Sequence, residues 1–385
     1  MHSKVDYTEN KTRIAILVPW LKSKGGVERA ILCIAEDKNY DVDIFTYDYE
    51  KEKTFEEFKE FKVHDIGKAK GGSFITRGLK LFYNLLFSRI KDLNSYDAFI
   101  ISTAGIAELA VFRNYHRNTI ALTHTPLRVA HTMYEYYKNS SYKYRILLPP
   151  LVWGYRILER AAWKHIDYAI VFSKEVKRRL VDYSLIRSNR IINIGPHVDY
   201  SEIKKSKKTE KIIFYGSRFI SYKRQGLAIE AFRLSNLPRL GFKLVLGGFV
   251  EDEKYFQRIK HIAGSDKNII IRSNLKEAEL RNLYSKCYAT LFLPINEDTG
   301  LVPLESLAYG KPVIAVNEGG PREFVRDGVN GLLVNAAPRS IANALDKIAK
   351  KSFYNKLRRG AASSPVYDRD RMRNNFENGM NIILS

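Results

Sequence analysis

Short apolar runs that alternate with helix-patterned segments constrain the fold of this 385-residue chain more than any other feature. In the first half, RIAILVPW (13–20) and DAFIIST (97–103) have the length and composition of buried strands. The segment GGVERAILCIAEDKN between them places apolar residues at helical spacing. Strands that alternate with helices predict a parallel sheet with right-handed crossovers. Further strands are expected at 40–47, 119–124, 165–173 and 190–196.

A lysine-rich segment, DYSEIKKSKKTEK (199–211), is typical of a linker, and the same pattern starts again after it. New strands are expected at 212–217, 242–248, 268–273, 289–294 and 311–316, with helices between them. The chain is therefore expected to form two α/β domains, residues 1–198 and 199–365, followed by a short segment, 366–385. Ligands of such sheets bind outside the carboxyl ends of the strands, so residues at these ends are the functional candidates.

The composition limits the classes of binding partner and the cell compartment that can be expected. Lys plus Arg is 64 and Asp plus Glu is 42, a net charge of +22 that favours nucleic acid, a phosphorylated small molecule or an anionic membrane. The two cysteines, Cys33 and Cys287, lie in apolar segments, which fits a reducing compartment. The N-terminus lacks the apolar core of a signal peptide, and no apolar run reaches the roughly 18 residues of a spanning helix. We expect a cytoplasmic protein.

The segment RGLKLFYNLLFSRIK (77–91) has an apolar stripe with basic ends. The stripe consists of Leu79, Phe82, Tyr83, Leu86, Phe87 and Ile90, and the residues predicted opposite it are Lys80, Asn84 and Ser88. A stripe of this width usually covers a sheet. Basic ends also allow the helix to lie on an anionic bilayer, so both interpretations stay open.

The stretch INEDTGLVPLE, after the strand that ends at Pro294, combines an expected anion site with two acids. Backbone N–H groups of Gly300, Leu301 and Val302 would lie at the positive start of a helix and could bind phosphate. Phosphate repels carboxylates, so Glu297 and Glu305 should bind something neutral that carries hydroxyls. We expect Glu297 to hold one sugar and Glu305 another, such as the ribose of a nucleotide.

Basic residues follow the first strand of the second half in FYGSRFISYKRQG. Arg218 and Lys223 lie on one turn and could converge on a diphosphate. Further along the chain, Gly319-Gly320 is expected to let the backbone pass close to the site.

Two strand ends of the first half carry candidate residues. Gly25-Gly26, in LVPWLKSKGGVERA, allows close backbone approach and offers a helix start to an anion; the spacing is not that of a nicotinamide site. In ALTHTPLRVAH, His124 could carry a proton at neutral pH and Arg128 suits a phosphate or a carboxylate.

Two Asp-x-Asp pairs, Asp41 with Asp43 and Asp368 with Asp370, could bind a divalent ion together with a nucleotide. Neither pair adjoins a phosphate-binding turn, so no metal is expected.

These motifs together resemble family 4 of the retaining glycosyltransferases. NEDTGLVPLESLAYGKPVIAVNEGGPREFV is similar to the donor-site signature of that family, with its Glu-x7-Glu pair, and YGSRFISYKRQGLAIEAF is similar to its diphosphate-binding turn. GGVERA and THTPLR match its acceptor-side loops. The resemblance implies a GT-B fold: an N-terminal acceptor-binding Rossmann-like domain (1–198), a C-terminal nucleotide-sugar domain (199–365), with the active site between them, and a helix (366–385) that returns to the first domain.

The resemblance also implies roles for single residues. By that likeness Arg218 and Lys223 hold the donor diphosphate, Glu297 contacts the transferred sugar and Glu305 the ribose. Leu275 and Lys276 lie where the nucleobase is held through the backbone. His124 lies at the reacting face, with Gly25, Gly26 and Arg128 on the acceptor side. Members need neither metal nor cofactor. Thr299 and Asn274 depart from the family pattern, which commonly has an aromatic residue and a glycine there.

The expected reaction is the transfer of a hexose, with retention, from a nucleotide diphosphate sugar to a glycan or a polyprenyl-phosphate-linked saccharide at the inner membrane face. HTPLR and FSKEVKRRL resemble the mannosyltransferase branch, which favours GDP-mannose over a UDP-hexose. A GT-B epimerase or phosphorylase is an alternative. A nucleic-acid-binding protein is the weakest one, because basic residues are not interleaved with aromatic residues in the way such proteins require.

Overall fold

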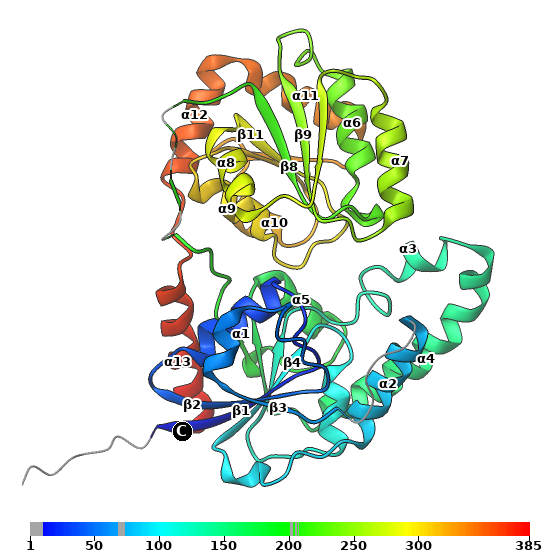
Figure 1. The fold of residues 1–385 in the computed structure, drawn as a ribbon, viewed down its shortest axis with the longest axis vertical. Helices are drawn as coiled ribbons and strands as arrows, with labels where there is room; N and C mark the ends of the chain where they lie inside the picture. Colours follow the sequence, from blue (N-terminus) through cyan, green and yellow to red (C-terminus); the bar gives the residue numbers. More distant parts are fainter. Residues whose placement is uncertain (1–10, 68–73, 201–202, 205, 207) are drawn as a thin grey trace, which may run out of the picture. The chain divides into compact units, whose positions relative to one another are not determined.

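The computed structural model describes residues 11–67, 74–200, 203–204, 206 and 208–385. It divides the chain into two compact units. Figure 1 draws the fold with colours that follow the sequence. Unit 1 comprises Met1–Gly195 and Asp370–Ser385, and unit 2 comprises Pro196–Arg369. The chain therefore enters unit 2 once and returns to unit 1 for its last helix.

Unit 1 contains a parallel sheet of seven strands in the order β3-β2-β1-β4-β5-β6-β7. Their bounds are β1 Thr12–Val18, β2 Tyr40–Thr46, β3 Lys62–Asp65, β4 Ala98–Thr103, β5 Thr119–Thr123, β6 Tyr168–Val171 and β7 Ile191–Asn193. The α-helices of this unit are α1 Gly26–Ala35, α2 Phe74–Phe87, α3 Tyr134–Lys138, α4 Tyr142–Trp163, α5 Lys174–Asp182 and α13 Arg369–Leu384. Short 3-10 helices are η1 Glu56–Glu60, η2 Leu93–Ser95, η3 Ala107–Phe112 and η4 Ser188–Arg190.

The central strands of unit 1 are mostly apolar because both faces of the sheet are covered. Successive residues of β1 enter opposite cores: Ile14 and Ile16 pack on one face, and Ala15 on the other. Helix α13 packs into the first of these cores through Met372, Phe376, Met380 and Ile383. The expected return of the C-terminal helix to the first domain is therefore confirmed.

Unit 2 contains a second parallel sheet, of six strands in the order β10-β9-β8-β11-β12-β13. Its strands are β8 Ile212–Gly216, β9 Lys243–Gly248, β10 Ile269–Ser273, β11 Ala289–Phe292, β12 Val313–Val316 and β13 Gly331–Val334. Its helices are η5 Ser221–Lys223, α6 Gln225–Leu234, α7 Glu253–Ala263, α8 Glu277–Lys286, α9 Leu301–Ala308, α10 Pro321–Phe324, α11 Pro338–Ala349 and α12 Lys351–Ala362. Both units thus have the doubly wound architecture that the alternating pattern predicts.

Two strands escaped the sequence analysis, and both lie at a sheet edge. Strand β3 has the sequence KVHD, with three exposed residues and no apolar run. Strand β13 begins at Gly331, which the sequence analysis left without a strand. At the edge of a sheet, β3 can keep exposed polar side chains. Strand β13 is apolar and largely buried, but it is only four residues long.

The orientation predicted for the helix at 77–91 was partly wrong. In α2, Leu79, Tyr83 and Phe87 are exposed, whereas Asn84 and Ser88 are buried. The two buried side chains contact each other, because the Ser88 hydroxyl donates to Asn84 Oδ1 at 3.4 Å. The Asn114 side-chain amide donates to the Ser88 carbonyl oxygen at 3.0 Å. Part of the apolar stripe therefore faces outward instead of covering the sheet.

Within the part of the chain that the structure describes, every helix is too short or too polar to cross a membrane.

Candidate functional site

Lys223 and Glu297 form an ion pair at the carboxyl edge of the unit 2 sheet. Lys223 ends η5, which follows β8, and Glu297 follows β11; the Lys223 Nζ to Glu297 Oε2 distance is 2.5 Å. The two residues are 74 positions apart in sequence. The Lys223 ammonium also lies 5.8 Å from the ring centre of Phe292. In the structure, the lysine that is expected to bind the diphosphate therefore contacts the glutamate that is expected to bind the sugar.

The loop that carries Glu297 is held by close packing of its backbone. Gly319 has φ +63°, and a β-carbon there would lie 2.2 Å from the Glu297 carbonyl oxygen. A β-carbon on Gly320 would lie 2.5 Å from the Asp298 carbonyl oxygen, and the Gly320 N–H donates to Glu297 at 2.8 Å. The close approach expected of Gly319-Gly320 is thus made against the Glu297 loop.

Helix α9 begins at Leu301, directly after Gly300, which has φ +91°. This left-handed conformation favours glycine. Gly300, Leu301 and Val302 supply the N–H groups of the first turn, and Pro303, which has no N–H group, follows them. The positive end of α9 thus carries the backbone donors expected for an anion.

Glu305 lies one turn into α9 and is held by a tyrosine. The Tyr284 hydroxyl donates to Glu305 Oε2 at 2.7 Å. Tyr284 is buried, and burial together with the Glu305 charge raises the pKa of its phenol well above the ordinary value. The phenol therefore remains a donor at physiological pH and orients the carboxylate. The sequence analysis did not identify Tyr284, which sits in the helical stretch RNLYSKC without any motif.

Arg218 is half exposed and pairs with an acid that the sequence analysis did not consider. Its Nη1 atom lies 2.6 Å from Glu251 Oε2. The Gln225 side-chain amide donates to the Arg218 carbonyl oxygen at 2.7 Å, so α6 fixes the backbone of this loop. Arg224, next to Lys223, binds Glu318 at 3.1 Å and thereby ties the β8 loop to the end of β12.

The expected nucleobase segment follows β10. Leu275 is half buried, and a β-carbon on Gly247 would lie 2.6 Å from Leu275 Cδ1. The Lys276 N–H donates to the Glu279 carboxylate at 2.9 Å and caps α8. Asn274, where the family pattern has glycine, has φ +53°. Asparagine tolerates this conformation better than most residues, so the departure preserves the backbone path.

His124 lies at the end of β5 in unit 1. Its ring stacks on Phe172 with centroids 4.9 Å apart, and its Nε2 atom lies 3.0 Å from the Ser102 hydroxyl oxygen. Burial lowers the pKa of His124 to about 4. The imidazole is therefore neutral at physiological pH and acts there as a hydrogen-bonding group. Arg128, four residues on, accepts a backbone bond from Met133 at 2.8 Å, which folds the loop back on itself.

The start of α1 already binds a carboxylate. The Gly25 N–H donates to Glu28 Oε2 at 3.2 Å, and the Ser23 hydroxyl donates to Glu28 Oε1 at 2.5 Å. Glu28 is buried in the first turn, where it complements the helix dipole. Gly26 is the first residue of α1. The Glu28 carboxylate would repel an anion bound at this helix start. The anion site predicted at Gly25-Gly26 did not take Glu28 into account.

A buried polar network supports the loop that carries His124 and Arg128, and the sequence analysis missed it. Tyr155 donates to Glu108 Oε1 at 2.7 Å, and Glu108 also accepts from Thr103 at 2.5 Å. Glu159 lies 3.2 Å from the same tyrosine hydroxyl and 2.7 Å from His131 Nε2. Burial raises the pKa of Glu108 to about 7. The sequence feature that could have indicated this network is a single acid, Glu108, inside the apolar run IAELAVF.

The Asp-x-Asp pairs have other partners in the structure. Asp43 is buried and accepts from the Tyr96 hydroxyl, and Asp41 lies 3.8 Å from Arg13. Asp370 is in the first turn of α13. In the described ranges, no group of three or more His, Cys, Asp or Glu side chains is arranged to hold a metal ion.

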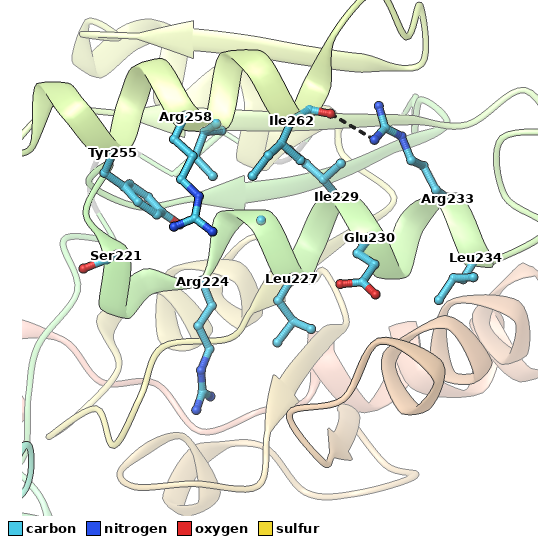
Figure 2. Close-up of a pocket in the computed structure, with 12 residues that line it drawn as sticks. Ser221, Arg224, Leu227, Ile229, Glu230, Arg233, Leu234, Tyr255, Arg258 and Ile262 are labelled. Atoms are coloured by element: carbon cyan, nitrogen blue, oxygen red, sulfur yellow. Dashed lines mark hydrogen bonds between the residues drawn. The ribbon is translucent and has the colours of Figure 1, made fainter. Parts of the chain in front are cut away.

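A groove of about 600 Å³ lies between α6 and α7 (Figure 2). Its lining includes Leu227, Ile229, Tyr255 and Arg258, and none of the site residues expected from the sequence. Figure 2 shows Arg224 pointing away from α7. This groove is separate from the Lys223–Glu297 pair.

Comparison with known proteins identifies the family of the chain. Residues 24–202 match the family described as Glycosyltransferase Family 4, and residues 199–363 match Glycosyl transferases group 1. The chain is similar to the alpha-1,3/1,6-mannosyltransferase ALG2 of Saccharomyces cerevisiae, with 27% identity over 98% of this chain and 86% of that protein. A shorter match to ALG2 of Dictyostelium discoideum has 38% identity over 26% of this chain and 25% of that protein.

Solved structures confirm the fold. A structure of Anabaena Alr3699/HepE in complex with UDP matches with a TM-score of 0.73 and 17% identity, over 96% of this chain and all of that one. The two family matches together span residues 24–363, which include every strand except β1 and also the Glu297–Glu305 pair. The chain belongs to the family 4 glycosyltransferases and has their GT-B fold.

Proposed function

We propose that the protein transfers a hexose, with retention, from a nucleotide diphosphate sugar, and that the hexose is mannose from GDP-mannose. The observation that carries the proposal is the Lys223–Glu297 pair at 2.5 Å, placed at the same sheet edge as the α9 start. It puts a cation for a diphosphate beside an acid for a sugar.

Charge development explains why this arrangement suits glycosyl transfer. The bond between the anomeric carbon and the diphosphate oxygen breaks, and the bond to the acceptor oxygen forms on the same face. The acceptor proton passes to the leaving phosphate oxygen. Negative charge grows on the diphosphate, where Lys223, Arg218 and the N–H groups at Gly300 to Val302 would stabilise it. A lysine ammonium has three donors, so Lys223 can bind phosphate while it keeps Glu297 in place.

The remaining residues have supporting roles in this proposal. Glu305, oriented by Tyr284, would accept hydrogen bonds from the ribose hydroxyls. Leu275 and Lys276 would contact the nucleobase. Neutral His124 would hydrogen-bond the transferred sugar or the acceptor, without supplying a positive charge at physiological pH.

The proposed donor and acceptor are inferred from the relatives and from the sequence motifs. The ALG2 proteins are mannosyltransferases by name, which supports GDP-mannose, and the HepE structure contains UDP, which keeps a UDP-hexose as the second choice. We propose a glycan acceptor, specifically a saccharide linked to polyprenyl phosphate at the cytoplasmic face of a membrane. Residues 1–198 would bind this acceptor and 199–365 the donor.

A thermal-shift panel of GDP- and UDP-sugars tests the donor. A ligand that binds only the folded state stabilises it by about 2.7 kcal/mol at a concentration of 100 Kd. GDP-mannose should raise the melting temperature most. A larger shift with a UDP-hexose would replace the donor and keep the reaction class, and conversion of the donor without any acceptor would indicate an epimerase instead.

Transfer rates of variants test the site itself. Arg218→Ala should lower the rate on the order of 10²–10³-fold, because one charge on the leaving group is lost. Arg339→Ala removes an exposed arginine of α11 and serves as the matched control. Near-native transfer by both Arg218→Ala and Lys223→Ala would refute the assignment.

A further inference from the structure

Helix α4 exposes an unusual number of large apolar side chains. Leu151 is 68% exposed and Trp153 is 70% exposed. The exposed set along this helix consists of Tyr142, Tyr144, Ile146, Leu147, Leu151, Trp153, Ile157 and Leu158. Soluble proteins usually expose such residues singly, and a contiguous patch of them indicates an interaction site.

The exposed residues follow the helical repeat. Tyr142, Ile146, Trp153 and Ile157 are spaced by four, seven and four positions, which aligns them along one stripe. Leu147, Leu151 and Leu158 form a neighbouring stripe with the spacings four and seven. The opposite side of α4 is the one that enters unit 1, through Val152, Glu159 and Ala162. The helix is thus amphipathic with its broad apolar side outward.

Helix α2 extends this surface. Leu79, Tyr83 and Phe87 are exposed at spacings of four, and the rings of Tyr83 and Phe87 lie 4.9 Å apart. Both α2 and α4 contact η3, which places the two helices in the same region of unit 1. We call the eight residues of α4 and the three of α2 the outer apolar surface.

The exposed charges carried by α2 and α4 themselves are all positive. The exposed basic residues on these helices and just beyond their ends are Arg77, Arg89, Lys91, Lys143, Arg145, Arg160 and Lys164. Between residues 76 and 91 there is no Asp or Glu, and between 142 and 164 the only acid is Glu159, which is buried. An anionic surface complements this arrangement. A second copy of the chain would place like charges against each other.

We propose that the outer apolar surface docks on an anionic lipid bilayer, with α4 and α2 lying in the interface. Apolar and aromatic side chains on one face with basic residues beside them are typical of helices that lie in the headgroup region. Trp153 and the exposed tyrosines suit this depth, since each combines an apolar ring with a polar group. The proposal does not depend on glycosyl transfer.

The inner side of α4 connects the docking surface to the His124 loop. Arg156 donates to the Ala130 carbonyl oxygen, with Nε at 3.0 Å, and Glu159 lies 2.7 Å from His131. Docking of α4 would therefore place this loop at a defined height above the bilayer. If the proposed function holds, a lipid-linked acceptor would reach the loop from the same membrane.

Vesicle partitioning of the full chain tests the docking. The probes are vesicles of phosphatidylcholine alone and of phosphatidylcholine with phosphatidylglycerol at a 7:3 ratio, sedimented without any sugar substrate. The chain should bind the anionic vesicles at least tenfold more tightly, because each basic residue near the surface adds attraction. The double variant Leu151→Asp, Trp153→Asp should bind them less tightly by a further factor on the order of 100, because two apolar groups leave the interface.

A control variant and two other outcomes separate the alternatives. Ile382→Asp changes a residue that is 62% exposed on α13, and it should bind like the wild type. Anionic binding that the α4 variant leaves unchanged would overturn the proposal in favour of adsorption by net charge. Dimers in light scattering that the α4 variant dissociates, without vesicle binding, would assign the surface to a second copy instead.

Tryptophan fluorescence supplies a readout of position. Trp153 emission should shift to shorter wavelength on the anionic vesicles, whereas Trp163 is buried and should not respond. Trp153→Phe keeps an aromatic ring, so binding should persist while the spectral shift disappears. A shift that survives this substitution would contradict insertion of α4. Unchanged melting temperatures of the variants confirm that each of them is folded.

Discussion

Replacing Glu108 with glutamine should stabilise unit 1 at pH 8 and leave its stability almost unchanged at pH 4. Glu108 is 1% exposed, and burial raises the pKa of its carboxyl from 4.5 to about 7. Glutamine has the shape of the protonated acid. It can still accept a hydrogen bond from Tyr155 and place its amide next to the Thr103 hydroxyl.

The sign and the size follow from proton linkage. The folded state holds the Glu108 proton more tightly than the unfolded chain does, so folding is favoured at low pH and stability falls as the pH rises from 4.5 to about 7. One pKa unit corresponds to about 1.4 kcal/mol, so the total loss is on the order of 3 kcal/mol. Glutamine does not titrate, and the variant avoids this loss.

Urea unfolding at pH values from 4 to 8, followed by tryptophan fluorescence, measures the effect. The three tryptophans, at positions 20, 153 and 163, all belong to unit 1, so the signal reports that unit. His124, whose pKa burial lowers to about 4, acts in the opposite direction because the unfolded chain protonates it first. The comparison of wild type with Glu108→Gln removes this contribution, because both proteins contain His124.

An exposed acid provides the matched control. Glu135→Gln, on α3, removes an acid whose pKa the hydrogen bond from Lys138 lowers, so it should leave the loss of stability between pH 4.5 and 7 as it is in the wild type. If Glu108→Gln also unfolds with the wild-type pH dependence, Glu108 is ionised at neutral pH and the reasoning from its burial fails.

Three further predictions concern the site residues. Lys223→Met should slow transfer on the order of 10²–10³-fold, and the double-mutant cycle with Glu297→Gln should show a coupling on the order of 0.5–3 kcal/mol in unfolding; additive effects would mean that the pair does not interact. Gly319→Ala should lower the melting temperature more than Gly328→Ala. Both glycines have positive φ, but only at Gly319 would the added β-carbon meet another backbone, so equal losses would contradict the close packing. The His124 imidazole should stay neutral in NMR spectra from pH 8 to pH 5 and titrate near pH 4; a midpoint near 6.5 would show that its ring is hydrated.

The strands predicted at the centre of each sheet are confirmed, because the apolar residues that indicate a buried strand all lie within the strand itself. All six residues of β4 are buried, and the apolar run from Ala98 to Ile101 marks this strand in the sequence. The sequence likewise indicated the turns at Gly300 and Gly319, because a positive φ restricts the residue type. It could not indicate β3, whose strand conformation depends on pairing with β2 rather than on its own side chains.

The candidate site, like the fold, could be predicted only in part from the sequence. Its residue types could be proposed from motifs, but the partners of those residues could not. Arg218 binds Glu251, and Glu305 is held by Tyr284, and neither partner stands in a motif. A contact between residues far apart in the chain leaves no periodic trace in the sequence.

The sequence by itself determined the two-sheet architecture and the strand ends that carry the Glu297–Glu305 pair, because periodicity and turn chemistry act over a few neighbouring residues. Only the tertiary structure decided which side of α2 and α4 faces outward. It also decided that Lys223 meets Glu297 and that Glu108, Tyr155, Glu159 and His131 share one buried network. These features depend on which surfaces the packed sheets leave covered, and burial is a property of the whole fold rather than of any single segment.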